Sequence, residues 1–192
     1  MALLQSPYVD IQTLTTDGFT IFHTAFHHES YSVLHNCLCH KIYAPICKSI
    51  VNVEDLTHGY TPLQYAVSLG DSNLVRLMAS IADCNSSGNS LLLHGKTPLI
   101  LAVEQNNYKV AQTLVELGPD KINVDQMDND GHTALVIAAS MGFANICQLL
   151  IQVGGADVQK KTKKGGQTAL QKAKKRKFEN VVEVLKSLGA EG

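Results

Sequence analysis

The sequence predicts an all-α solenoid of about five helix-turn-helix repeats with short β-hairpin loops. The first observation is a threonine that recurs at intervals of 41, 36, 36 and 35 residues, at Thr20, Thr61, Thr97, Thr133 and Thr168. The second is a glycine two residues before each threonine, and the third is an alanine five residues after it. Repetition at a fixed spacing is typical of proteins in which each unit covers the next.

The stretch from Asp130 to Gly142 shows how one unit is built. Gly131 suits a backbone position with positive φ, and the hydroxyl of Thr133 can cap a helix by accepting from a first-turn amide. Gly142 ends this helix. Its apolar face is formed by Leu135, Ala138 and Ala139. A second apolar helix then begins with Ile146, Leu149 and Leu150.

The same pattern divides the whole chain. Residues 1–15 form an N-terminal lead-in, and residues 16–192 form one repeat domain, with repeats that start near residues 17, 58, 94, 130 and 165. We expect the second helix of the first repeat between Tyr31 and Cys39, and a loop from Asp83 to Gly88.

In two repeats, another residue takes the place of the glycine that ends the first helix. Asn106 occupies this position in the third repeat, and asparagine is the next best residue there. In the fifth repeat the position is Lys177, after a lysine-rich first helix. A polar outer face is what a terminal repeat requires, since no further repeat covers it.

The repeat core is similar to that of a known family. Residues 59–66 and 95–102 resemble the G-x-T-P-L-H-x-A core of the ankyrin-repeat family, and the resemblance extends over most of residues 16 to 190. The family pattern implies a hydrogen bond between its histidine and the threonine. Only His23 keeps that histidine, so the bond is expected to be missing in the other four repeats, which carry Gln64, Ile100, Val136 and Gln171.

Composition narrows the class of protein. Hydrophobic residues make up 45% of 192 residues, enough for a continuous core, and no apolar run is long enough to span a membrane. The N-terminus has neither the basic start nor the apolar stretch of a signal peptide. The five cysteines show no disulfide framework. A reducing compartment is therefore expected, the cytoplasm or the nucleus.

Catalytic and metal-binding motifs are missing from the sequence. We find no glycine-rich phosphate loop, nucleophile elbow or HExxH motif, and we expect no enzymatic activity and no cofactor. One group of side chains invites a zinc hypothesis: His27, His28, His35 and His40 near Cys37, Cys39 and Cys47. Zinc needs four converging ligands, and residues two apart on a helix do not share a face. We therefore expect no metal site.

The resemblance implies where a partner protein binds, because ankyrin proteins use their hairpin tips and the exposed side of each first helix. The corresponding hairpin positions are Asp17, Phe19, His58, Tyr60, His94, Lys96, Asp130 and His132. The corresponding helix positions are His27, His28, Ser68, Leu69, Glu104, Gln105, Ser140 and Met141. Four of these are large groups that we expect to be exposed, as in a protein-binding hot spot: Phe19, Tyr60, Leu69 and Met141.

The charge is unevenly distributed. Residues 1–159 hold 6 Lys and Arg against 14 Asp and Glu, a net −8, whereas residues 160–192 hold 10 against 3, a net +7. The basic cluster is Lys160, Lys161, Lys172, Lys174, Lys175, Arg176 and Lys177. It resembles a bipartite nuclear-import signal. The interpretation that we favour is that the cluster is simply the solvent-exposed face of the terminal repeat. Contact with nucleic acid or anionic lipid is a third interpretation.

Among ankyrin proteins, the sequence most resembles one subgroup. Residues 17–29 resemble the opening repeat of inhibitor-of-κB (IκB) proteins, as do the long first interval and residues 155–170. This resemblance implies a regulator, monomeric on its own, that binds Rel/NF-κB-type transcription factors. The alternatives are a generic ankyrin adaptor or host-targeted effector with another protein partner, and a module that uses the basic fifth repeat to bind nucleic acid or lipid.

Overall fold

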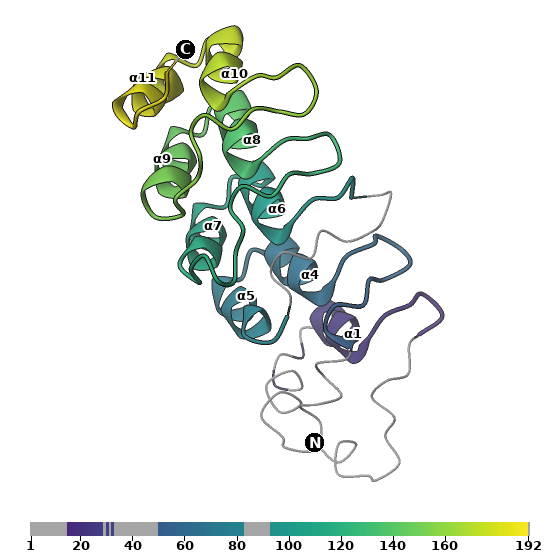
Figure 1. Cartoon of the computed structure of the whole chain (residues 1–192). Coiled ribbons are helices and arrows are strands. Elements are labelled where there is room, and N and C mark those ends of the chain that lie inside the picture. Colours follow the sequence, from purple (N-terminus) through teal and green to yellow (C-terminus); the bar gives the residue numbers. More distant parts are fainter. Residues whose placement is uncertain (1–14, 29, 31, 33–49, 83–92, 192) are drawn as a thin grey trace.

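The computed structural model describes residues 15–28, 30, 32, 50–82 and 93–191 of the chain. One row holds the first helices of the repeats: α1 (Ile21–His27), α4 (Pro62–Leu69), α6 (Pro98–Glu104), α8 (Ala134–Met141) and α10 (Ala169–Arg176). A second row holds α5 (Ser72–Ala79), α7 (Tyr108–Val115), α9 (Ala144–Gln152) and α11 (Glu179–Ser187). Figure 1 shows the hairpin loops on the side of the first row that faces away from the second row. The predicted all-α solenoid is confirmed.

The expected β-hairpin loops are turns, with no strand among the described residues. They close through backbone hydrogen bonds, for example from the Asp55 N–H to the Tyr60 carbonyl and from the Asp128 N–H to the His132 carbonyl, both at 3.0 Å. The lead-in up to residue 14 lies outside the described residues. So do the loop at Asp83–Gly88 and, apart from residue 32, the helix expected within Tyr31–Cys39.

The recurring threonine starts the helices as predicted. The hydroxyl oxygens of Thr61, Thr97, Thr133 and Thr168 each accept from the N–H three residues later, at 3.2–3.3 Å. At the far ends, Asn106 has φ +53° and Lys177 has φ +61°, so both hold the left-handed conformation that glycine usually supplies. Local sequence therefore sets both ends of these helices.

The glycine before the capping threonine allows one hairpin to stack closely on the next at Gly18, Gly95 and Gly131. Gly131 has φ +79°, and the Lys163 N–H donates to its carbonyl at 3.1 Å. A Cβ on Gly131 would fall 2.8 Å from the Lys163 nitrogen, so a side chain would push the two hairpins apart. In the hairpins before α4 and α8 the acceptor is the residue before the glycine: the Leu56 N–H donates to the Asp17 carbonyl at 2.9 Å and the Asn129 N–H to the His94 carbonyl at 2.8 Å.

The recurring alanine lies where the first helices pack on one another. Each helix of the row contacts the next, α1 with α4, α4 with α6, α6 with α8 and α8 with α10. The five alanines are at most 5% exposed: Ala25, Ala66, Ala102, Ala138 and Ala173. A small side chain at this position allows the helices to approach closely, and interiors packed this tightly do not absorb extra methylene groups without strain.

A side chain at the third helical position joins neighbouring repeats. The Thr20 N–H donates to His23 Nδ1 at 3.1 Å, so Nε2 carries the proton and donates to the Tyr60 carbonyl of the next repeat at 2.9 Å. Gln64 makes the same pair of bonds. Its Oε1 accepts from the Thr61 N–H at 2.8 Å, and its Nε2 donates to the Lys96 carbonyl at 2.8 Å.

The expectation that four repeats lack the bond at this position is therefore wrong for Gln64. It is also wrong in part for Gln171, which makes the first of the two bonds: its Oε1 accepts from the Thr168 N–H at 3.1 Å. The physical reason is that a glutamine amide offers one acceptor and one donor at nearly the same reach as an imidazole. Ile100 and Val136 have no polar side-chain atoms and make no such bond.

We predict that Gln64→Ala lowers the free energy of unfolding by about 1–3 kcal/mol, because the buried Thr61 N–H and the partly buried Lys96 carbonyl lose their partners. Gln64→His should restore most of the loss, since His23 makes both bonds in the first repeat. Gln171→Ala is the comparison variant and should cost less, because the Gln171 side chain is exposed and makes, among the described residues, only the capping bond. Urea unfolding of the three variants measures this. Equal losses for the two alanine variants would contradict a bridge between repeats.

Candidate protein-binding face

The hairpin tips and the C-terminal ends of the first helices share one surface, which we call the hairpin face. It comprises the residues just before each capping threonine and those four, seven and eight positions after it. Lys96 at a tip lies 2.9 Å from Glu104 at the end of α6, measured from Nζ to Oε2. His132 at the next tip lines the same hollow as Ser140 at the end of α8. The two predicted sets of residues therefore converge in space.

Exposure divides the predicted residues of this face. Exposed residues are Asp17, His28, His58, Leu69, His94, Gln105, Asp130 and Met141. Half-buried residues are Phe19, Tyr60, Ser68, Lys96, Glu104, His132 and Ser140. His27 belongs to α1, and its side chain lies outside the described part of the chain.

The expectation of four exposed large groups holds for two of them. Leu69 is 46% exposed and Met141 is 42% exposed. It is wrong for Phe19 and Tyr60, which are half-buried because other rings cover them. Phe19 stacks on His23 with ring centroids 5.7 Å apart, and Tyr60 meets Tyr65 edge to face at 6.0 Å.

The N-terminal end of the hairpin face is aromatic. Tyr65 also meets His23 edge to face at 6.2 Å, so the first and second repeats share one cluster of rings. Burial raises the pKa of Tyr65, and the charge of Asp55 and the nearby Tyr60 raise it further, so the phenol is neutral at physiological pH. Tyr65 was not among the residues predicted from the sequence. It stands four residues after Thr61, and the residues at the same position of later repeats, Ile137 and Lys172, line a hollow together with His132 of a hairpin tip.

Buried acidic residues hold the hairpin tips in place. Asp55 accepts from the N–H groups of Thr57 at 2.9 Å, His58 at 2.6 Å and Tyr60 at 3.0 Å. Asp128 accepts in the same way from the His132 N–H at 2.8 Å. Because these carboxylates satisfy backbone donors, they fix the shape of the loop. They also place the rings of His58 and His132 within 4 Å, at 3.6 and 3.8 Å from the carboxylate oxygens.

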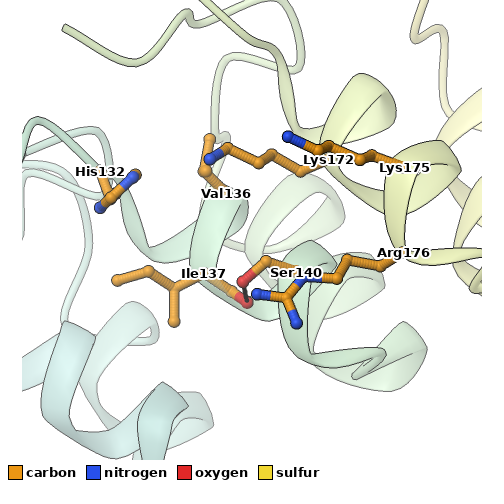
Figure 2. A pocket seen from close by; sticks show the side chains of 7 residues that line it. All are labelled: His132, Val136, Ile137, Ser140, Lys172, Lys175 and Arg176. Atoms are coloured by element: carbon orange, nitrogen blue, oxygen red, sulfur yellow. Dashed lines mark hydrogen bonds between the residues drawn. The ribbon is translucent and has the colours of Figure 1, made fainter. Parts of the chain in front are cut away.

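The C-terminal end of the hairpin face is a basic hollow of about 350 Å³ between α8 and α10. Its lining residues are His132, Val136, Ile137, Ser140, Lys172, Lys175 and Arg176. Figure 2 shows the three cationic side chains of α10 on one side, His132 on the opposite side and the residues of α8 between them.

The structure divides the predicted basic cluster. Lys172, Lys175 and Arg176 line the hollow, whereas Lys160, Lys161, Lys174 and Lys177 do not. Helix α10 covers residues 169–176, so the larger part of the cluster is helical. Import signals are usually bound as an extended chain, and the helical conformation disfavours that interpretation.

No catalytic group stands out in the described part of the chain. Cys147 is fully buried, and this burial raises the pKa of its thiol to about 12, so it stays protonated and is a poor nucleophile. Among the described residues, no three His, Cys, Asp or Glu side chains are grouped to hold a metal ion. Of the histidines and cysteines of the zinc hypothesis, only the His28 side chain lies in this part. No described helix has the length and apolar character needed to cross a membrane.

These features identify the class of protein, a helical repeat module in which hairpin tips and first-helix ends share one face. The chain belongs to the ankyrin-repeat family, since the family model for ankyrin repeats matches residues 31–125 and 120–192. Ankyrin repeats are protein–protein interaction modules, and their fold is typically non-catalytic.

Solved structures support the same fold. The ankyrin repeat protein EF0377 matches with a TM-score of 0.76 at 22% identity, over 96% of this chain and 88% of that one. The ankyrin repeat domain of Bcl-3, described as a unique member of the IkappaB protein family, matches with a TM-score of 0.77 at 22% identity, over 99% of this chain and 78% of that one. A comparison with curated protein sequences gives no significant match. At this identity the likeness establishes the fold alone.

Proposed function

We propose that the chain binds a protein partner through its hairpin face. The observation that carries this proposal is the exposure of Leu69 and Met141 on a face whose loops are fixed by buried carboxylates. Large apolar groups surrounded by polar neighbours are common anchors of protein interfaces. A face that is already ordered loses little conformational entropy when it binds, which favours affinity.

Rel/NF-κB-type transcription factors are the partner class that we propose for this face. Two observations support the proposal. Residues 17–29 resemble the opening repeat of IκB proteins, and the Bcl-3 ankyrin domain, described as a member of the IkappaB family, has the same fold over 99% of this chain. Such a partner requires that the chain resides in the cytoplasm or the nucleus.

Binding through the hairpin face predicts that loss of its exposed apolar side chains weakens capture of the partner. We expect Leu69→Ala/Met141→Ala to weaken capture of the partner by about tenfold or more, because truncating two anchors removes over 1 kcal/mol each. Phe19 and Tyr60 are left intact since both support the fold through ring contacts. Affinity purification followed by mass spectrometry, with labelled wild-type protein as the reference, measures the change.

The matched control for this prediction changes equally exposed residues of the second row. Tyr108 is 40% exposed and Val153 is 55% exposed, and both line a shallow hollow between α7 and α9. Tyr108→Ala/Val153→Ala should leave capture unchanged. Loss of the partner in this control, with retention in the Leu69/Met141 variant, would place binding on the second-helix row and contradict the proposal.

The second prediction concerns the partner class. A purified Rel-homology region should bind the whole chain with a dissociation constant of about 1 μM or tighter, measured by titration calorimetry. An unrelated DNA-binding domain of similar net charge is the control. Absence of binding at about 100 μM would reject the IκB-like role. If the hairpin-face variant still loses its captured partner, the chain is then a general ankyrin adaptor.

A further inference from the structure

The basic hollow holds positive charge that the described part of the chain does not neutralise. None of its seven lining residues is acidic. Within the described residues, the side chains of Lys172, Lys175 and Arg176 make no ion pair or hydrogen bond. The two acidic residues of the adjoining hairpin are engaged elsewhere. Asp128 accepts from the His132 N–H, and Asp130 lies 3.4 Å from the ammonium of Lys164.

Two apolar side chains of α8, Val136 and Ile137, lie between the cations of α10 and His132. Val136 is 2% exposed and Ile137 is 9% exposed, so they form its base. The Ser140 hydroxyl donates to the Ile137 carbonyl at 2.9 Å, which leaves its oxygen only as an acceptor. The donors available to a ligand are therefore the cationic groups of α10, with the His132 ring on the opposite side of the hollow.

We propose that the basic hollow binds the carboxylate side chains of an acidic peptide segment in the partner protein. The Arg176 guanidinium offers a planar fork of donors that matches a carboxylate, and the two lysine ammonium groups can meet neighbouring acids. The methylene groups of glutamate would lie on Val136 and Ile137. This inference rests on the proposed function, because it gives the hairpin face a second, charged anchor beside Met141.

The shape of the hollow favours a peptide over a nucleic acid. A volume of about 350 Å³ is at the small end of ligand pockets, enough for a few side chains. Single-stranded nucleic acids are held chiefly by stacking on aromatic side chains, and no Phe, Tyr or Trp lines the hollow. Phe178, the aromatic residue next to the basic cluster, is half-buried and packs against the core.

A fluorescent octaglutamate peptide tests the inference directly. Its binding to the whole chain is measured by fluorescence anisotropy in low salt, beside an octaglutamine peptide and a single-stranded oligonucleotide of equal charge. Lys172→Gln/Lys175→Gln/Arg176→Gln should weaken binding of octaglutamate by about tenfold or more. The control Lys161→Gln/Lys163→Gln/Lys186→Gln removes three charges from the same end, outside the hollow, and should weaken it by less than about twofold.

Ser140→Asp provides a second variant that leaves every cation in place. A new carboxylate in the hollow should pair with the cations and compete with octaglutamate, again weakening binding by about tenfold. Equal losses in the two glutamine variants would show diffuse attraction and overturn the inference. So would tighter binding of the oligonucleotide that depends on the same three cations, or failure of wild type to bind octaglutamate.

The outcome can be separated from that of the proposed function. If the hollow variant keeps its captured protein partner while Leu69→Ala/Met141→Ala loses it, the hollow has no role and the hairpin face still binds. If both variants keep the partner, both proposals fail. If the hollow variant and Leu69→Ala/Met141→Ala each lose the partner, both proposals are supported. Retention of the partner by the two control variants then excludes a general loss of folding.

Discussion

The fold depends on the stacking of each repeat against its neighbours, because no single helix pair can bury its own apolar face. Ala138 allows this stacking by keeping α8 close to α6 and α10. Hydrogen bonds across the junctions, from Gln64 to the Lys96 carbonyl and from Lys163 to the Gly131 carbonyl, fix how far one repeat can slide on the next. Small side chains and interrepeat bonds together therefore set the register of the whole row.

A fixed register brings surface residues that are far apart in the sequence onto one face, the hairpin face. In the third repeat, the 2.9 Å pair of Lys96 and Glu104 holds the hairpin tip against its own first helix. Successive repeats then present the same positions side by side, with aromatic rings at the N-terminal end and cations at the C-terminal end. The two parts of the sequence also differ in net charge, −8 for residues 1–159 and +7 for residues 160–192.

Features set by neighbouring residues along the chain could be predicted from the sequence. The caps at Thr133 and Thr168 and the left-handed Asn106 follow from local chemistry, so these helix ends could be predicted. Contacts between repeats could not be read from one unit. The bond from Gln64 to a carbonyl 32 residues away and the covering of Phe19 by His23 both depend on how helices lie beside each other.

The central claim is that a partner covers the hairpin face, and side-chain oxidation footprinting of the partner-bound chain tests it most directly. Met141 and Tyr108 are well matched probes, because they are 42% and 40% exposed on different rows of helices. Our account predicts that the partner protects Met141 from hydroxyl radicals and leaves Tyr108 as reactive as in the free chain. Protection of Tyr108 with an unchanged Met141 would contradict it.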